Sequence, residues 1–330
     1  MKRAGRGLSR RDAIKALGMI GGGLLVGTGA WANAADKSAI VAKAHRPGIL
    51  AGGSPDPEAV RSAVDAAVAK AAGTASPADA WAQMFRPSDT VGIKINALGL
   101  PPLRTSPAVV DAIITGLAGA GVSQTRIIVW DMSELQMRRA GYRVSTRPDA
   151  VRFIGNDSPG VGYADETFMH RSIESRLSRV VSDMCTALVN VPVVKDHDLA
   201  GVSAGMKNWY GAVHNPQAYH ASGCDPYIAD LSALPAIRQK LRLVVADGLT
   251  AQCHGGPNYV AEYAWPAEMI MASADPVAID AVARGIIEGE RARRGLPTLE
   301  EAGRPAEYIH TAASLGLGTD DEAAITTVAV

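Results

Sequence analysis

The sequence has few aromatic residues, no surplus of either charge and few cysteines, and each shortage excludes a class of protein or structure. Phe, Trp and Tyr make up 5% of the 330 residues, so the core must rely on aliphatic packing. There are 33 lysines and arginines against 33 aspartates and glutamates, which gives a formal net charge of zero. Nucleic-acid-binding proteins carry a basic surplus or stripe, so this balance argues against a nucleic acid as partner.

The sequence lacks the cysteine and glycine motifs that bind common cofactors. The three cysteines, Cys185, Cys224 and Cys253, form no C-x-x-C pair and no four-cysteine pattern, so no iron–sulfur cluster is expected. Their odd number also excludes complete internal disulfide pairing. No G-x-G-x-x-G turn follows the first predicted strand, so a dinucleotide-binding fold is not supported.

Residues 1–34 have the pattern of a targeting segment. A basic start is followed by a short, glycine-containing apolar stretch, Ala16–Ala30, which is too brief for a membrane span, and then by A-N-A at 32–34 as a cleavage site. The stretch S-R-R-D-A-I-K at 9–15 resembles a twin-arginine export signal, although Ala13 replaces the usual phenylalanine. A Sec signal that happens to contain two arginines is the alternative. We therefore expect a periplasmic or otherwise exported protein that meets the twin-arginine translocase during export and keeps no stable membrane span after cleavage.

The remaining chain has the pattern of an α/β fold. A predicted strand at 90–97, a helix that begins at Ser106-Pro107 and a second strand at 126–131 form a right-handed βαβ unit. Further strands are predicted at 151–154, 187–194, 241–247 and 269–275, and further helices at 133–141, 228–241, 276–287 and 307–317. Residues 156–176 form either a hairpin or a flap. We expect a largely parallel or mixed sheet with flanking helices, in an α/β domain over 88–330 that follows a helical lead-in at 35–87.

The stretch from Val191 to His220 is the strongest candidate for a functional site. It holds three of the seven histidines, two lysines and three glycines, and it follows a buried apolar strand. That strand ends in Lys195, Asp196 and His197, which places ionisable groups at a strand's carboxyl end, where open α/β sheets bind ligands.

The candidate residues fall into three groups by the chemistry that their side chains can perform. A histidine can accept or donate a proton near neutral pH, and a lysine in a desolvated pocket can become a nucleophile or covalent anchor. Imidazoles can ligate nickel, zinc or iron, and polar groups at strand ends can orient a substrate. The predicted catalytic residues are His197 and Lys207; the predicted ligand contacts are Lys94, Asn96, Lys195, Asn208 and Asp247; the predicted metal ligands are His214, His220 and His254. For acids at strand ends, such as Asp131 and Asp247, a cap or turn role is the alternative, and for Asp280 a capping or surface role is favoured.

Several short motifs in order resemble one family, the domain of unknown function 362. The matching segments are G-I-K-I-N at 92–96, V-P-V-V-K at 191–195, His197, G-M-K-N at 205–208, D-G at 247–248, H-G-G-P at 254–257, D-P-V-A at 275–278 with Asp280, and L-G-L-G at 315–318. Many relatives carry an appended ferredoxin-like module with four-cysteine motifs. This chain lacks those cysteines, so the resemblance does not imply an iron–sulfur cluster here.

A shorter likeness concerns the segment 197–207, H-D-L-A-G-V-S-A-G-M-K. It is similar to the H-x-x-x-A-G-x-S-G-G-x-K segment of nickel-pincer lactate racemases, with Ala204 in place of a glycine. The likeness implies an acid–base role for His197, a cofactor-anchoring role for Lys207 and a later nickel ligand, for which His214 and His220 are the candidates at unmatched spacing.

Two functions follow from these observations. The first is an exported enzyme of isomerase or oxidoreductase type that acts on a small polar metabolite with a metal or organometallic cofactor, a divalent nickel, zinc or iron being one candidate. The second is a non-catalytic periplasmic binding protein or carrier for a metal, a cofactor or an anionic ligand. A purely structural or adhesive module fits poorly, because its polar residues would not gather at strand ends.

Overall fold

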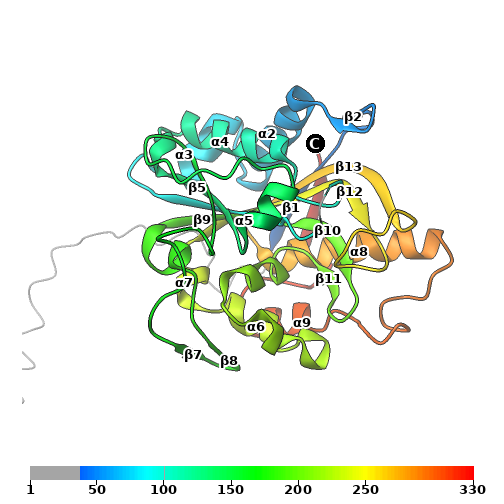
Figure 1. The fold of residues 1–330 in the computed structure, drawn as a ribbon. Helices are drawn as coiled ribbons and strands as arrows, with labels where there is room; N and C mark the ends of the chain where they lie inside the picture. The colour runs from blue at the N-terminus through cyan, green and yellow to red at the C-terminus, as the bar shows by residue number, and fades with distance from the viewer. Residues whose placement is uncertain (1–37, 100) are drawn as a thin grey trace, which may run out of the picture. The chain divides into compact units, whose positions relative to one another are not determined.

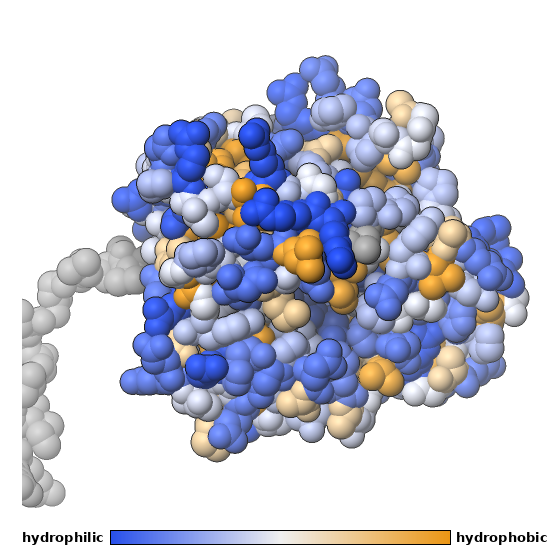
Figure 2. Space-filling view, in the orientation of Figure 1, coloured by the Kyte–Doolittle hydropathy of each residue, from blue (hydrophilic) through white to orange (hydrophobic). Residues whose placement is uncertain are grey.

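The computed structural model describes residues 38–99 and 101–330, which all belong to one compact unit. The predicted targeting segment 1–34 lies outside the described residues. In the described part of the chain, no helix is both long and apolar enough to cross a membrane. The face seen in Figure 2 is mostly hydrophilic, with small separate apolar areas.

A mixed, mostly parallel sheet runs through the middle of the protein (Figure 1). In the described residues it has ten strands, of which eight follow the order β14 (Ile325–Ala329), β1 (Ala39–His45), β13 (Ala264–Ser273), β12 (Leu241–Gln252), β9 (Ala187–Asn190), β4 (Val91–Lys94), β5 (Ile127–Asp131) and β6 (Arg152–Gly155). Strands β12, β9, β4, β5 and β6 pair in parallel, while β13 is antiparallel to both of its neighbours. Two further strands, β10 (Val193–His197) and β11 (Gly201–Ser203), complete the sheet beside β12. The predicted α/β fold class is confirmed.

Helices cover both faces of the sheet, so the fold has three layers (Figure 1). One face packs against α2 (Pro57–Ala71), α3 (Pro77–Met84) and α4 (Pro107–Gly119), and the other against α6 (Tyr227–Ser232), α7 (Pro235–Arg238), α8 (Pro276–Arg293) and α9 (Tyr308–Ser314). Helix α5 (Glu134–Arg139) follows β5. The remaining elements are two small hairpins, β2 (Leu50–Ala51) with β3 (Ser54–Pro55) and β7 (Phe168–His170) with β8 (Ile173–Ser175), and short 3₁₀ or π turns at Gln124–Arg126, Val180–Met184, Lys207–Ala212, Pro216–Tyr219 and Ala221–Cys224.

Local sequence fixes where the longer helices begin. Asp56, Ser106 and Asp275 each precede a proline, and each side chain accepts a hydrogen bond from a backbone N–H of the first turn of α2, α4 or α8. A proline at the first helical position loses no hydrogen bond, because that N–H has no partner within the helix. The helix start predicted at Ser106-Pro107 is confirmed.

Alternation along the strands separates two buried cores. Ile93 on β4 lies beside Val129 on β5 and Val189 on β9, in the core under α2 and α4. The next residue, Lys94, lies beside Trp130 and Asn190 on the opposite face. Successive side chains of a strand point to opposite faces, so the polar residues at these strand ends share one side of the sheet.

Three sequence-based predictions of elements need correction. The run 187–194 is two strands rather than one, because the chain breaks at Val191-Pro192 between β9 and β10. Residues 228–241 form two short helices, since Pro235 begins α7 instead of continuing α6. The lead-in at 35–87 is not only helical, because β1 pairs with β13 and β14 in the sheet. Of the two alternatives for 156–176, its end belongs to the β7–β8 hairpin.

The break at Val191-Pro192 creates a fork in the sheet. Strand β12 pairs with β9 along its first part and with β10 along its second part. Strand β4 pairs with β9, and Val191 N donates to Lys94 O at 2.7 Å. Beyond that bond β10 pairs with β12 and β11, so we call the space between the end of β4 and β10 the fork.

Candidate functional site

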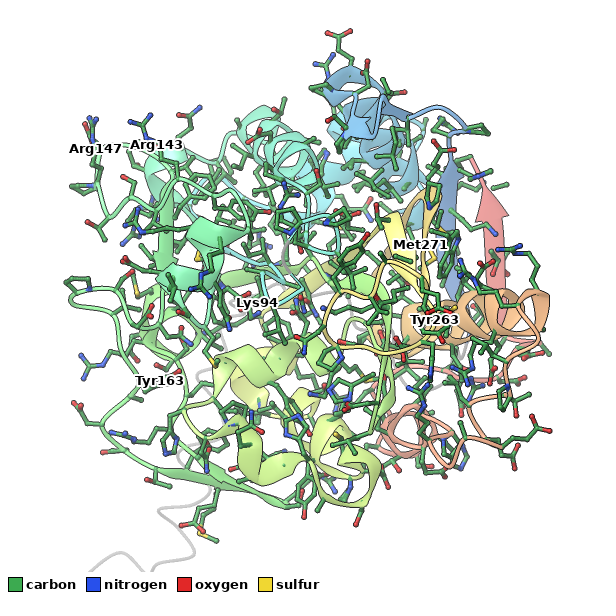
Figure 3. The ribbon with its side chains drawn as sticks, turned by 45° about the vertical axis from the view of Figure 1, so that its right-hand side comes forward. Lys94, Arg143, Arg147, Tyr163, Tyr263 and Met271 are labelled. Atoms are coloured by element: carbon green, nitrogen blue, oxygen red, sulfur yellow. The ribbon has the colours of Figure 1, made fainter. Side chains whose placement is uncertain are left out.

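The floor of the site is a buried ion pair at the carboxyl ends of β4 and β5. Lys94 Nζ donates to Asp131 Oδ1 at 2.7 Å, and both side chains are buried. Asp131 Oδ2 accepts from Ala97 N at 2.7 Å, and Lys94 Nζ also donates to Ile95 O. Burial lowers the pKa of Lys94, and the attraction of Asp131 opposes that shift. Figure 3 shows Lys94 in the middle of the molecule, among the ends of the strands.

Three asparagines join this pair to the fork. Asn208 Oδ1 accepts from Lys94 Nζ and from Asn96 Nδ2, each at 3.3 Å. Asn208 Nδ2 donates to Asn190 Oδ1 at 2.8 Å, and Asn190 Nδ2 donates to Gly205 O. The amides therefore fix one another's orientation. All three N–H donors of Lys94 have acceptors, so none is left for a ligand.

Lys195 extends from β10 into the fork without a carboxylate partner. Its side chain is fully buried, and Nζ donates to Asn96 Oδ1 at 3.2 Å and to Pro257 O at 3.0 Å. In the described residues no carboxylate oxygen lies within 4.0 Å of this nitrogen. Burial lowers the pKa of Lys195 to about 8, while the charges of Asp131 and Asp196 act in the opposite direction.

Lys207 lies between an imidazole and an aromatic ring. Its Nζ is 3.3 Å from His220 Nε2 and 3.6 Å from the ring centre of Tyr210. The His220 Nδ1 lies 3.0 Å from Pro216 O, which can only accept, so Nδ1 carries the proton and Nε2 accepts from Lys207. Burial lowers the pKa of Lys207 to about 8 and also lowers the pKa of His220.

His197, at the end of β10, stacks on His220. The ring centres are 5.7 Å apart at an angle of 25°. Leu199 N and Ala200 N both point at His197 Nδ1, at 3.2 and 3.3 Å, so the neutral ring carries its proton on Nε2. Burial and the positive charge of Lys207 lower the pKa of His197 to about 2. The exposed Asp198 carboxylate, 3.1 Å from Nδ1, would pair only with a protonated ring, and the two backbone donors favour the neutral one.

Glycines let the backbone approach the lysines closely. A Cβ at Gly211 would lie 2.8 Å from Lys94 Nζ and 3.0 Å from Asp131 Oδ1. A Cβ at Gly99 would lie 1.9 Å from Leu103 O and 3.2 Å from Lys195 Nζ. Larger residues at either position would displace the groups that hold the cluster.

The carboxylate of Asp280, on α8, holds the turn that carries Lys207. Its oxygens accept from Gly205 N at 2.6 Å, from Met206 N at 3.1 Å and from the Tyr308 hydroxyl at 3.1 Å. Burial raises the pKa of Asp280 to about 7. The capping role favoured from the sequence describes this residue, although it caps a turn of a distant segment.

A second buried ion pair holds the end of β10 in place. Asp196 Oδ2 accepts from Arg304 Nη1 at 2.8 Å, and Arg304 Nη1 also donates to His197 O. The other guanidinium nitrogen, Nη2, is 3.1 Å from His254 Nδ1. His254 therefore belongs to this support and not to a metal site with His220.

The predicted site residues thus come together in part. Lys94, Asn96, Lys195 and Asn208 form one hydrogen-bonded group. His197, Lys207 and His220 form a second group of contacts. The charges of Lys195 and Lys207 both act on His197, and we call the two groups together the lysine cluster. Asp247 lies elsewhere: it accepts from Ser106 N and Leu249 N, and burial raises its pKa to about 6. His214 is exposed and accepts from Arg176 N beside the β7–β8 hairpin.

The donor set does not fit a metal ion. Among residues 38–99 and 101–330, no group of three or more His, Cys, Asp or Glu side chains could hold one. His214, His220 and His254 have three different sets of neighbours, so they form no common ligand set.

Sequence reasoning missed Asn190, Tyr210 and Gly211. Asn190 interrupts the apolar run A-L-V-N-V-P-V-V, and an amide in a buried strand is the signal that could have identified it. Tyr210 and Gly211 directly follow the predicted Lys207-Asn208 pair, but their roles depend on the 3₁₀ turn at Lys207–Ala212, which the sequence pattern does not predict.

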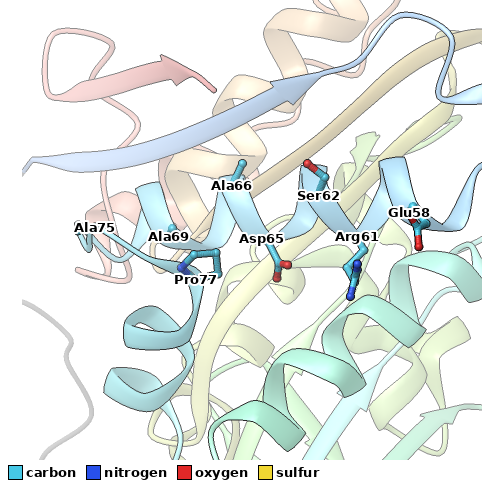
Figure 4. Close-up of a pocket in the computed structure, with 8 residues that line it drawn as sticks. All are labelled: Glu58, Arg61, Ser62, Asp65, Ala66, Ala69, Ala75 and Pro77. Carbon is cyan, nitrogen blue, oxygen red and sulfur yellow. The ribbon is translucent and has the colours of Figure 1, made fainter.

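A shallow depression of about 680 Å³ lies on the outer side of α2, away from the strand ends (Figure 4). It is lined by Glu58, Arg61, Ser62, Asp65, Ala66, Ala69, Ala75 and Pro77. It contains no member of the lysine cluster, and its open wall of alanines and charged side chains offers no convergent polar groups.

A model of the domain of unknown function DUF362 matches residues 91–284 of this chain, and the lysine cluster lies within that range. The chain belongs to the DUF362 family. No curated protein matches it. Among solved structures it is similar to a structural-genomics crystal structure of a Thermotoga maritima protein, with 10% identity and a TM-score of 0.40. That comparison covers 79% of this chain and 59% of the other. The likeness to lactate racemases receives no support from these comparisons.

Proposed function

We propose that this DUF362 protein is an enzyme that binds a small anionic metabolite at the lysine cluster and moves a proton on it. The observation that carries the proposal is that Lys195 and Lys207 are buried and have no carboxylate partner in the described structure. Proton transfer of this kind is isomerase chemistry. An exported, periplasmic location remains part of the proposal.

The pairing of the charges around the lysine cluster supports an anionic ligand. Asp131 neutralises Lys94, and Asp196 neutralises Arg304. Lys195 and Lys207 remain, and with a pKa of about 8 each is mostly protonated at pH 7. A buried, unpaired ammonium group destabilises the protein, and a carboxylate or phosphate that reaches both lysines would remove that cost.

The two histidines supply the proton chemistry. Both are neutral at physiological pH, and they present different nitrogens: His220 an unprotonated Nε2 towards Lys207, and His197 a protonated Nε2. A neutral imidazole can accept a proton from one position of a bound ligand while another donates to a second position. A metal ion has no part in this proposal, because the described side chains do not form a ligand set for one.

A non-catalytic carrier of anions is the second candidate. It is favoured by the extensive bonding of Lys94 and Lys195, which suits rigid electrostatic binding. The enzyme and the carrier share ligand affinity and differ in whether the ligand is changed.

Calorimetric titration with pyruvate, lactate and inorganic phosphate tests ligand binding. We expect Lys195→Met to weaken the binding of a carboxylate by about tenfold or more, the value of one lost charge-assisted hydrogen bond. Lys240→Met is the matched control, because Lys240 is partly buried and donates to Val181 O and Ser182 O before β12, at the other end of the strands. Equal affinity of both variants would contradict the anion site.

Hydrogen–deuterium exchange of the ligand separates enzyme from carrier. An enzyme should replace carbon-bound protons of pyruvate with deuterium in D₂O, observed by proton NMR, and His220→Gln should abolish that exchange while leaving pyruvate bound. Binding without any exchange would favour the carrier.

A further inference from the structure

We propose that Lys207 is a nucleophile that forms an imine with the carbonyl carbon of a 2-oxo acid, while Lys195 binds the carboxylate of the same molecule. This inference rests on the proposed function and names its substrate class: an anion with a carbonyl group next to the carboxylate. It also gives the three buried lysines three different tasks.

The surroundings of the three amines differ in the way that their three different tasks require. Lys94 Nζ has a carboxylate at 2.7 Å and two further oxygen acceptors, so its nitrogen is held as an ammonium group. Lys195 Nζ has two neutral oxygen acceptors and keeps a donor for a ligand. Lys207 Nζ has no oxygen acceptor among the described residues, and its polar partner is the nitrogen of His220.

Lys207 can therefore become a neutral amine more readily than Lys94. Three nearby oxygen acceptors stabilise an ammonium group, whereas an imidazole nitrogen at 3.3 Å can itself take the proton. The ring of Tyr210, 3.6 Å from Nζ, covers one side of the amine and directs attack to the other side. A pKa of about 8 for Lys207 agrees with this geometry, because about a tenth of the amine is then neutral at pH 7.

The reaction balances with groups that the cluster and the oxo acid supply. Lys207 Nζ passes one proton to His220 Nε2, and the neutral amine forms a bond to the carbonyl carbon of the oxo acid. The carbonyl oxygen takes that proton back from His220 and a second proton from the nitrogen, and leaves as water. C=O is thus replaced by C=N, and the third proton of the ammonium group stays on the iminium nitrogen. No oxidant or reductant is required. The resulting imine makes the neighbouring C–H acidic, and an imidazole of the cluster can remove that proton.

We assign the two lysines to one ligand because their charges act on each other and on His197. The charges of Lys207 and Lys195 both lower the pKa of His197, and Lys207 also lowers the pKa of Lys195. Ser203, four residues before Lys207, lies opposite Lys195 in the β10–β11 pair, and Asp280 holds the turn that leads from Ser203 to Lys207.

Trapping with borohydride tests the proposal on the complete chain. The protein is incubated separately with pyruvate, 2-oxobutyrate, 2-oxoglutarate and glyoxylate, reduced with sodium borohydride and digested for peptide mass spectrometry. We expect the peptide that contains Lys207 to gain the mass of one reduced oxo-acid residue. Lactate, which has a carboxylate but no carbonyl group, should leave no adduct.

Lys207→Arg sharpens the test, because arginine keeps the positive charge and cannot form the imine. We expect its affinity for pyruvate by calorimetry to stay within about tenfold of the parent, since one charge is retained, while trapping is lost. Circular dichroism checks that the variant folds, and the mapping of the adduct on the unmodified protein needs no variant.

The outcomes separate this inference from the proposed function. An adduct on Lys207 supports both. Calorimetric binding of these acids without an adduct, or with the adduct on Lys195 or Lys240, overturns the imine and leaves the anion site standing. Failure of all four oxo acids, lactate and phosphate to bind overturns both.

Discussion

The two faces of the sheet are built from the same strands and differ in character at the carboxyl ends of those strands. Under α2, α3 and α4 the strands contribute aliphatic side chains such as Ile93, Val129 and Val189, which pack into a continuous core. On the other face, at the carboxyl ends of β4 and β9, the next residues are Lys94 and Asn190, and Asp131 follows Trp130 at the end of β5. Both faces therefore carry an apolar core, and at this end of the sheet the second face also holds buried charge.

The proposed binding site has a cost in stability that the fold tolerates. Burial of apolar area contributes about 25 cal/mol per Å², whereas a buried ion pair contributes little net stability. The free energy from apolar burial thus offsets the cost of the buried charge. Changes on the first face should alter stability and spare the site, and changes on the second should alter both.

The largest effect is expected for Asp131→Ala. It leaves Lys94 buried without its counter-ion, and the loss of one partner of a buried pair costs about 3–5 kcal/mol. Urea unfolding followed by circular dichroism measures the change in free energy, and calorimetry measures the accompanying loss of pyruvate binding. A loss of stability like that of a surface substitution would show that the pair is not what holds this end of the sheet.

A smaller effect, confined to stability, is expected for Ile93→Ala. The substitution removes buried methyl groups one residue away from Lys94, on the opposite face, at a cost of about 2–5 kcal/mol. The same unfolding assay measures it, and pyruvate affinity should remain within the error of the parent value. A matching loss of affinity in folded protein would break the distinction between the faces.

The smallest effect is a pH dependence that belongs to the polar face. Lysine titrates near pH 10.4 when unfolded, and burial lowers the pKa of Lys195 and of Lys207 to about 8. Between these pH values the unfolded chain binds more protons, so stability should rise with pH, by up to about 1.4 kcal/mol per pH unit for each lysine. Below pH 8 the cost of burying the charged amines is fully present.

Unfolding curves between pH 7 and 10 measure this slope. Lys195→Met should reduce it, and Lys70→Met, at an exposed position on α2, should leave it unchanged. An unaltered slope in Lys195→Met would mean that Lys195 keeps its proton as readily in the folded protein as in the unfolded chain.

Much of the fold follows from the sequence because strand alternation and helix starts are local properties. The run T-V-G-I-K-I-N-A and the Ser106-Pro107 start are each decided by a few neighbouring residues. The failures involve long-range pairing. Nothing within Ala39–His45 says that it lies between β13 and β14, and nothing before Val191-Pro192 says that β12 is long enough to pair with strands on both sides of the break.

The site was predicted where chemistry clusters along the chain and missed where it depends on contacts in space. Lys195, His197 and Lys207 lie in one glycine-rich stretch, so their types and spacing indicate a site. His214 and His254 also lie in glycine-rich segments. In the fold, however, the ring of His214 contacts the backbone of Arg176 and the ring of His254 contacts Arg304, so the two rings do not meet. Ligand sets are decided by such directions, which spacing in sequence does not encode.

The fork between β4 and β10 has a consequence for motion. A backbone ladder keeps neighbouring strands in step, and here it ends at the bond from Val191 N to Lys94 O. Past that point the side chains of Asn96 and Thr105 bridge the two sides, through Lys195 Nζ and Val191 O. A ligand that takes over the bond of Lys195 would loosen one of these bridges while the rest of the sheet stays fixed. Binding of a small molecule would then change the distance between β10 and the end of β4, and the amide exchange rates of Val193–His197 would report that change.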